Sequence, residues 1–191
     1  MHYTKKEIFS QDEAIEKTYN YLQEKEKEIK YIFEKIDCDS ITFIGSGSSY
    51  SLCQSAEMST KIHTNFSANS FAAGDLMLNY SHYKNIIENT ILVAPSRSGS
   101  TSEVIKSVKK AKNDFDTPVV SISASEDSDL SRLADLDLTL PWAFDESVCQ
   151  TRTVTNLYLA QLFLVAVISD KDSMIEEIGK AVSEESSYID N

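Results

Sequence analysis

The sequence has few of the residues that build cross-linked or membrane-spanning proteins. Its three cysteines, Cys38, Cys53 and Cys149, are an odd number without a CxxC spacing, so we expect neither a disulfide framework nor a zinc site. No apolar run approaches the ~20 residues of a membrane span, and the charged N-terminus lacks the apolar segment of a signal peptide. These absences predict a cytoplasmic protein with no membrane partner.

Positive charge is also scarce. The chain carries 18 Lys and Arg against 30 Asp and Glu, which gives a formal net charge of −12. A surface field of this sign repels nucleic acid and anionic lipid. We therefore expect neither as a partner.

Patterns of short strands and helices alternate along most of the chain. With 191 residues, 41% of them hydrophobic, the chain can bury one core, so we expect a single domain at 37–191 preceded by an N-terminal helix at 1–36. That helix is expected to start with a capping box, because Glu13 stands three places after Ser10. The predicted strands are Ile41–Ile44, a weaker run near Thr64–Ser67, Ile91–Val93, Val119–Ile122 and Leu136–Leu140; the predicted helices are 49–62, 71–80, 101–113, 126–134 and a long pair after 150.

This alternation predicts an α/β fold, in which a doubly wound, five-stranded parallel sheet lies between two layers of helices. The usual strand order for such a sheet is the flavodoxin-like 2-1-3-4-5. In that order the chain changes direction between the first and third strands, and ligands bind in the crevice that opens there.

Two loops rich in hydroxyl groups would border that crevice. They are Gly45-Ser46-Gly47-Ser48-Ser49-Tyr50 after the first strand and Pro95-Ser96-Arg97-Ser98-Gly99-Ser100-Thr101 after the third, and together they hold three of the five glycines of the chain. Glycine lets backbone amides approach an anion, and each loop opens a helix whose first-turn N–H groups favour a phosphate. Helix capping alone would explain either loop, but two such loops at one crevice favour an anion site.

The common nucleotide motifs do not match these loops. The first has tyrosine where G-x-G-x-x-G needs its third glycine, and the P-loop pattern G-x-x-x-x-G-K-[ST] is absent. A small phosphorylated molecule held by hydroxyls and amides remains. Arg97 either adds positive charge to the site or points into solvent.

At this point the sequence resembles a known family. GSGSSY at 45–50 and SRSGST at 96–101 are similar to loops of the sugar isomerase (SIS) domain, and Glu146–Tyr158 resembles a segment of the tagatose-6-phosphate ketose/aldose isomerase group, which includes aminosugar-phosphate deaminases. The resemblance covers about residues 40–170. It implies a sugar phosphate or aminosugar phosphate as ligand, and no cofactor or metal. The contacts expected from the loops and the resemblance are Ser46, Gly47, Ser48, Ser49, Ser96, Arg97, Ser98, Gly99, Ser100, Thr101 and Thr151.

The resemblance also indicates what this chain lacks. Members of that group usually have two such domains, and the second domain or a neighbouring subunit contributes a catalytic glutamate and a ring-opening histidine. Here His2, His63 and His82 all fall away from the expected crevice, and Glu146 is the only carboxylate that we nominate as a catalytic base. The alternative interpretation of Glu146, a solvated surface acid beside Asp145, is favoured slightly over the catalytic one.

Three functions therefore stay open. The chain is one half of a sugar-phosphate isomerase or deaminase, a sensor that binds a phosphosugar without turnover, or a structural domain whose loops only cap helices. The predicted helix Thr151–Ile168 is apolar nearly all round and must be covered by the sheet and by the predicted C-terminal helix Ser173–Tyr188 or another subunit. We expect a homodimer.

Overall fold

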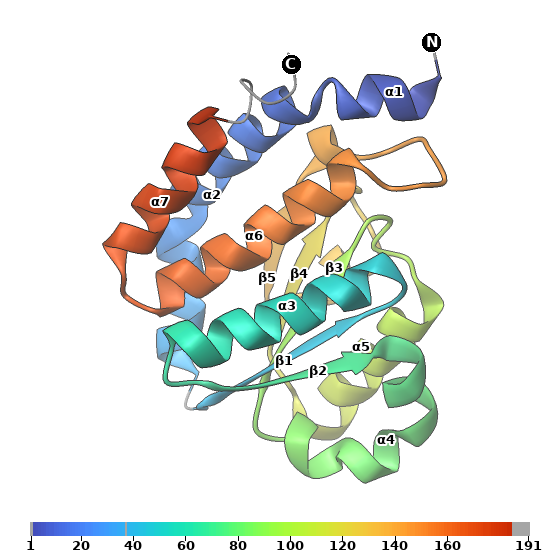
Figure 1. Cartoon of the computed structure of the whole chain (residues 1–191). Coiled ribbons are helices and arrows are strands. Elements are labelled where there is room, and N and C mark those ends of the chain that lie inside the picture. Colours follow the sequence, from blue (N-terminus) through green and yellow to red (C-terminus); the bar gives the residue numbers. More distant parts are fainter. Residues whose placement is uncertain (1, 37, 185–191) are drawn as a thin grey trace.

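Five parallel strands form one sheet in the order β2-β1-β3-β4-β5, as predicted from the sequence. The computed structural model describes residues 2–36 and 38–184, and Figure 1 labels its elements. The strands are β1 (Ser40–Gly45), β2 (Ser67–Ala72), β3 (Ile91–Ser96), β4 (Val119–Ser123) and β5 (Leu136–Thr139). In the register, Ile41 of β1 lies opposite Ala68 of β2 and Ile91 of β3.

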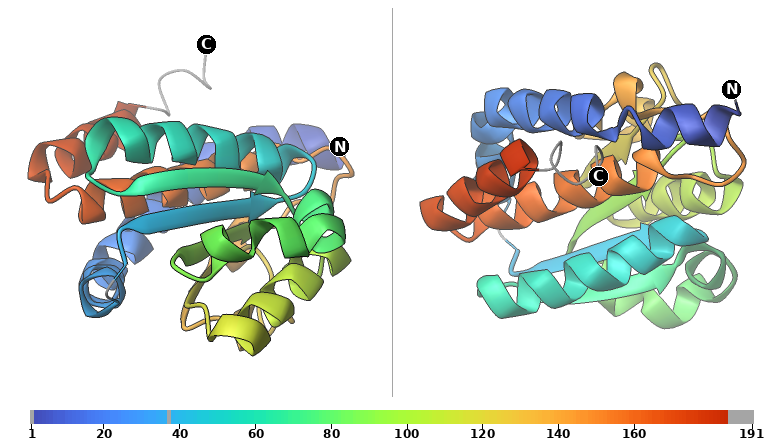
Figure 2. Two further views of the ribbon diagram at one scale, coloured as in Figure 1. Left: turned by 90° about the horizontal axis from the view of Figure 1, so that it is seen from below. Right: turned by 45° about the horizontal axis from the view of Figure 1, so that its top comes forward.

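Helices cover both faces of this sheet (Figures 1 and 2). The helices are α1 (Tyr3–Ile8), α2 (Gln11–Lys35), α3 (Ser48–His63), α4 (Ala73–Ile87), α5 (Ser102–Phe115), α6 (Arg152–Ile168) and α7 (Asp172–Glu184), with short 3₁₀ turns η1 (Ser131–Leu133) and η2 (Pro141–Ala143). Alternate residues of each strand point to opposite faces. In β3, Ile91 and Val93 face the core under α2, α3 and α6, and Leu92 and Ala94 face the core under α4 and α5.

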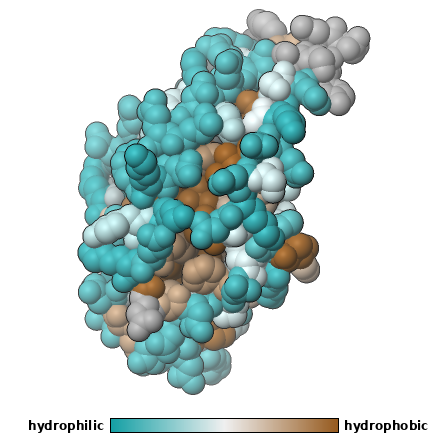
Figure 3. Space-filling model, turned by 90° about the vertical axis from the view of Figure 1, so that its left-hand side faces the viewer, coloured by the Kyte–Doolittle hydropathy of each residue, from teal (hydrophilic) through white to brown (hydrophobic). Residues whose placement is uncertain are grey.

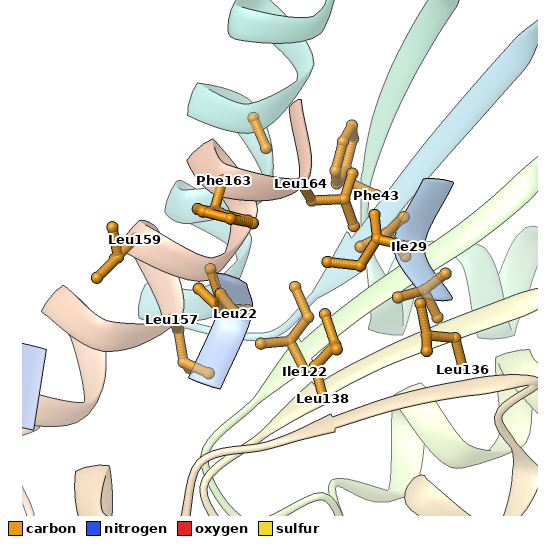
Figure 4. Close-up of a cluster of buried hydrophobic side chains, with 14 of the residues drawn as sticks. Leu22, Ile29, Phe43, Ile122, Leu136, Leu138, Leu157, Leu159, Phe163 and Leu164 are labelled. Carbon is orange, nitrogen blue, oxygen red and sulfur yellow. The ribbon is translucent and has the colours of Figure 1, made fainter. Parts of the chain in front are cut away.

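The larger core lies beneath α6, the helix expected to be apolar nearly all round. Figure 4 shows Leu157, Phe163 and Leu164 of this helix near Leu22 and Ile29 of α2 and Phe43 of β1. Leu22, Ile29 and Phe43 have no exposed surface. On its outer side α6 packs against α7, which belongs to the same chain. The remainder of the predicted C-terminal helix, up to Tyr188, lies outside the described residues.

The N-terminal helical region differs from its prediction. It is divided into α1 and α2 at Phe9 and Ser10, and the Ser10 side chain makes no capping bond to α2. The Ser10 hydroxyl instead donates to the Glu7 carbonyl at 3.3 Å and accepts from Arg152 at 3.1 Å. Glu13 pairs with Lys17 at 2.6 Å, so the predicted capping box is wrong although α2 does begin at this point.

Two further boundaries were wrong. The helix predicted at 126–134 is only the turn η1, because the Leu130 amide bonds to the Gly99 carbonyl at 2.9 Å and the Ser131 amide to the Ser128 hydroxyl at 3.1 Å. The strand expected near Thr64–Ser67 runs instead over Ser67–Ala72, with α4 beginning directly after it. β2 is an edge strand of small and polar residues, so its sequence carries a weak strand signal.

Within the described ranges, no helix combines the length and apolarity that a membrane crossing needs.

Candidate functional site

The carboxyl ends of β1 and β3 lie side by side, because the two strands pair directly in the sheet. The loops that follow them enclose a cleft of about 100 Å³. Its lining residues are Ser46, Ser49, Pro95, Ser96, Arg97, Ser98, Thr101, Val104 and Gln150. The fold thus brings together the two loops that the sequence placed at the switch point.

The loop after β3 is shaped largely by its own hydroxyl groups. The buried Ser96 hydroxyl accepts the Gly99 amide at 3.1 Å and lies 3.4 Å from the Thr101 hydroxyl. The Ser98 hydroxyl accepts the amide of Ser100 at 3.3 Å, which curls the loop toward the start of α5. These short-range bonds fix the loop before any ligand binds.

Gly99 is required at its position for two reasons. Its φ of +58° lies in the left-handed region that other residues adopt at a cost. A Cβ at this position would also collide with the side chain of the buried Ser128. The loop therefore depends on glycine here.

The loop after β1 brings a second helix start to the cleft. A Cβ at Gly45 would lie 2.7 Å from the backbone carbon of Ser49, so glycine allows α3 to begin close against the end of β1. Ser46 and the buried Ser49 line the cleft, whereas Gly47 and Ser48 are exposed and do not. Because α3 and α5 both start here, two sets of first-turn N–H groups and two helix dipoles favour an anion in the cleft.

Arg97 does not point freely into solvent. It lines the cleft, donates from Nη1 to the Ser147 carbonyl at 2.7 Å, and lies over the Phe144 ring at 6.0 Å. The guanidinium thus joins the loop after β3 to the segment that precedes α6. It also supplies the only positive side chain among the lining residues.

That segment, Asp145–Thr151, forms a third wall of the site and is called the Asp145–Thr151 loop below. The buried Asp145 carboxylate accepts the amides of Thr151 at 2.7 Å and Thr153 at 2.9 Å, which anchors the end of the loop to the start of α6. Glu146 is exposed and does not line the cleft. The expected contact Thr151 does not line it either, but its hydroxyl is buried without a hydrogen-bond partner in the described residues.

Gln150 is a candidate that the sequence reasoning missed. Its side chain lines the cleft, and its buried carboxamide oxygen has no hydrogen-bond partner among the described residues. A buried acceptor without a partner costs about 1–3 kcal/mol, which a donor on a bound ligand would recover. Only its place beside Thr151 in the sequence could have suggested it.

The lining residues include no carboxylate and no histidine. His2 and His82 are exposed, and His63 is the last residue of α3, at the far end of the helix that starts at the cleft. Serine, threonine and amide groups hold an anion but do not move protons at neutral pH. In the part of the chain that the structure describes, no cluster of three His, Cys, Asp or Glu side chains could hold a metal ion.

The arrangement defines a doubly wound α/β domain with a polar, hydroxyl-lined cleft where its strand order reverses. Residues 36–168 match the model of the SIS domain, and the chain belongs to the SIS domain family. The resemblance seen in the sequence is confirmed by this match.

Similar proteins include enzymes and a regulator. The chain is 28% identical over 181 residues, 87% of its length, to glutamine–fructose-6-phosphate aminotransferase (isomerizing) of Wigglesworthia glossinidia brevipalpis, and spans 28% of that protein. It is 30% identical over 108 residues, 54% of its length, to an uncharacterized HTH-type transcriptional regulator of Clostridium perfringens, of which it spans 37%.

A solved structure with a similar fold is tagatose-6-phosphate ketose/aldose isomerase from Escherichia coli. Its TM-score is 0.79 at 18% identity, and the match covers 97% of this chain and 54% of that one. This chain therefore spans about half of that protein, and less of the two relatives. At such identity the likeness shows the fold alone.

Proposed function

We propose that the chain binds the phosphate group of a sugar phosphate or aminosugar phosphate in the cleft between the loops after β1 and β3. The observation that carries this proposal is the meeting of two helix starts and a hydroxyl-lined loop at one polar cleft. Pockets for drug-sized ligands measure about 300–1,000 Å³. A cleft of about 100 Å³ suits a phosphate group and the adjoining part of the sugar, which would lie against Gln150, with the rest of the sugar outside it.

Within this proposal the phosphate contacts come from two groups of residues. The hydroxyls of Ser96, Ser98 and Thr101 face the phosphate from the loop after β3, and those of Ser46 and Ser49 do so from the loop after β1. The expected contacts Gly99 and Ser100 do not line the cleft, and their amides already donate to the Ser96 and Ser98 hydroxyls, so they shape the loop. Gly47 and Ser48 lie at the outer rim, where a sugar would emerge. Arg97 offsets the phosphate charge, and Thr151 belongs to the sugar-facing side.

We further propose that the chain supplies the phosphate-binding half of an aldose–ketose isomerase or an aminosugar-phosphate deaminase. Both reactions begin with proton transfer at C1 and C2 of an open-chain sugar, which needs a base within about 3 Å and a donor for the enediolate oxygen. Glu146 belongs to the Asp145–Thr151 loop, yet it does not line the cleft. The chain by itself is expected to bind its ligand with little or no turnover.

The first experiment measures binding. Titration calorimetry with fructose, tagatose and glucosamine 6-phosphates should show binding, and the same sugars without phosphate should not bind. Equal affinity for phosphorylated and unphosphorylated sugars would refute the phosphate site. No binding of any of them would favour the purely structural reading.

The second experiment follows products by NMR. Turnover near background is expected, because losing a general base costs about 10²–10⁴-fold. A turnover number of order 1 s⁻¹ that Glu146→Gln abolishes would instead make Glu146 the base. Binding without turnover, even in the presence of any second domain from the same protein, would favour a phosphosugar sensor.

We also propose that residues 37–191 form a single domain, with the helical segment 1–36 packed against it. We propose further that the protein is a homodimer in the cytoplasm. An apolar groove of about 270 Å³ lies between α2, α6 and α7. Its lining residues are Ile15, Thr155, Tyr158, Leu159, Leu162, Ile178, Ala181 and Val182. Figure 3 shows hydrophobic atoms in the middle of a mostly hydrophilic face on the α7 side. Sedimentation at tens of micromolar that finds only a 21.4 kDa species would refute the dimer.

A further inference from the structure

Glu7 is a buried carboxylate far from the cleft in sequence but tied to its wall. It lies in α1 with 4% of its surface exposed. One oxygen, Oε1, accepts the amide of Glu146 at 2.8 Å and the amide of Ser147 at 3.1 Å. Two consecutive amides of the Asp145–Thr151 loop therefore share one acceptor from a different part of the chain.

Other contacts join the same parts of the chain. The Thr4 hydroxyl of α1 lies 2.9 Å from the Ser147 hydroxyl. Arg152, at the start of α6, donates to the Ser10 hydroxyl at 3.1 Å and to the Phe144 carbonyl at 2.5 Å. Figure 1 shows α1 lying beside the loop that leads into α6. The N-terminal segment is thus hydrogen-bonded to the Asp145–Thr151 loop and to the start of α6.

The loop is held from the cleft side as well. Arg97, which lines the cleft, donates to the carbonyl of Ser147, the residue whose amide Glu7 accepts. Ser147 is therefore fixed between the N-terminal segment and the loop after β3. Three residues further on, Gln150 lines the cleft with an unpartnered carboxamide oxygen.

The carboxylate form of Glu7 suits this role. Burial by itself raises the pKa of Glu7, but hydrogen bonds from Ser147 and Glu146 and the positive charge of Arg152 outweigh it and lower the pKa. A buried carboxylate is costly, and here only Oε1 is paired, because Oε2 is buried without a hydrogen-bond partner in the described residues. The cost is therefore offset only while the loop stays within hydrogen-bond distance of Oε1.

We propose that Glu7 is a positioning residue, which holds the Asp145–Thr151 loop so that Gln150 and Thr151 face the sugar of a bound sugar phosphate. This inference rests on the proposed function and adds to it: the N-terminal segment, outside the two phosphate loops, governs recognition of the sugar portion. Inorganic phosphate needs only the loops after β1 and β3. Loss of Glu7 should therefore lower the affinity for sugar phosphate and leave the affinity for inorganic phosphate unchanged.

The test compares Glu7→Ala, Glu7→Gln and the control Glu13→Gln in the full chain. Glu13 is an exposed glutamate of α2 whose partner is Lys17, so the control removes the same charge nearby. Calorimetry with fructose 6-phosphate, glucosamine 6-phosphate and inorganic phosphate gives the affinities. Hydrogen exchange gives the protection of the amides at 146–151.

For Glu7→Ala we expect faster exchange at 146–151 and about 10-fold or greater loss of sugar-phosphate affinity, the scale of a charge-assisted hydrogen bond. The affinity for inorganic phosphate should change by less than about 2-fold. Glu7→Gln keeps one acceptor oxygen and should recover part of the loss. Glu13→Gln should change neither affinity.

Unchanged sugar-phosphate affinity in Glu7→Ala, or an equal loss of both affinities, would overturn the proposal. If Glu7→Ala does not fold, Thr4→Val removes the neighbouring contact without removing a buried charge, and the same separation of affinities is required of it. Wild-type protein that binds phosphate but no sugar phosphate would overturn the proposed function, whereas the exchange rates would still decide whether Glu7 holds the loop.

Discussion

The loop after β3 and the Asp145–Thr151 loop face the same cleft but are held in different ways. The first is braced by bonds between residues two to five positions apart, such as Gly99 to Ser96 and Ser100 to Ser98, and by the amides of Ala124 and Leu130, 27 and 31 positions from their acceptors Arg97 and Gly99. The second is braced by Glu7, 139 and 140 positions away, and by Arg97, 50 positions away. It also retains buried atoms without partners at Gln150 and Thr151.

This difference suggests that the two loops contact different parts of a ligand. A loop braced by its own hydroxyl groups is preorganised and suits a group that every ligand shares, which in the proposed function is the phosphate. A loop that depends on distant residues and keeps unsatisfied polar atoms suits the part of the ligand that varies. The following changes test each half of that contrast.

The largest effect is expected from Gly99→Ala. A methyl group at a φ of +58° is strained, and it would collide with Ser128. Together these should lower the free energy of unfolding by about 3 kcal/mol, measured by urea denaturation. Gly47→Ala is the comparison for backbone strain without a side-chain collision: its φ is +59° and its ψ −130°, but the space around it is open, so its loss should be smaller than that of Gly99→Ala. Equal losses would show that the contact with Ser128 does not shape the loop.

Removing a hydroxyl from the same loop should affect binding more than stability. Ser98→Ala or Thr101→Ala is expected to weaken binding of both inorganic phosphate and sugar phosphate by about 1–3 kcal/mol. Calorimetry measures both ligands, and Ser183→Ala on α7 serves as a control outside the cleft. If both cleft variants bind as tightly as the wild type, the phosphate is not held by this loop.

Gln150→Ala tests the contribution of the Asp145–Thr151 loop to binding. Its carboxamide has no partner to lose within the described residues, so folding should be little affected. We expect about 1 kcal/mol weaker binding of a sugar phosphate and unchanged binding of inorganic phosphate. A loss for inorganic phosphate as well would place Gln150 on the phosphate and remove the contrast between the loops.

The smallest effect concerns pH. The pKa of Glu7 is lowered from its ordinary value of 4.5, so its stabilising contribution is complete above that value and is lost as the pH falls through the lower, folded-state pKa. The difference in unfolding free energy between wild type and Glu7→Gln should therefore be constant near neutrality and shrink below about pH 4.5.

Salt provides the control for the pH experiment. The pKa of Glu13 is also lowered, by its hydrogen bond to Lys17, but this pair is exposed and 1 M salt should screen it. The Glu7 difference should persist in salt, because Ser147, one of its two donors, is buried with it. If 1 M salt removes the difference between wild type and Glu7→Gln, Glu7 does not act through buried hydrogen bonds to the Asp145–Thr151 loop.

Much of the fold could be predicted from the sequence because its signals are local. Apolar runs such as Ile91–Val93 mark buried strands, and the regular alternation with helices predicts a parallel sheet and its order. The helix and strand boundaries that were predicted wrongly are those that depend on competing contacts or on a weak local signal. Leu130 bonds to Gly99 instead of continuing a helix, and the polar edge strand β2 carries little propensity.

The sequence by itself determined the part of the site for which we propose phosphate binding. Its glycine and serine residues come directly after two strands and act over a few positions, and those strands are neighbours in any sheet of this order. Only the tertiary structure decided the remainder. It tied Arg97 to Ser147, placed Gln150 on the cleft wall and set Glu7 behind it. These contacts join residues 50 to 140 positions apart, and no local propensity or spacing encodes a hydrogen bond between segments that meet only when the chain folds.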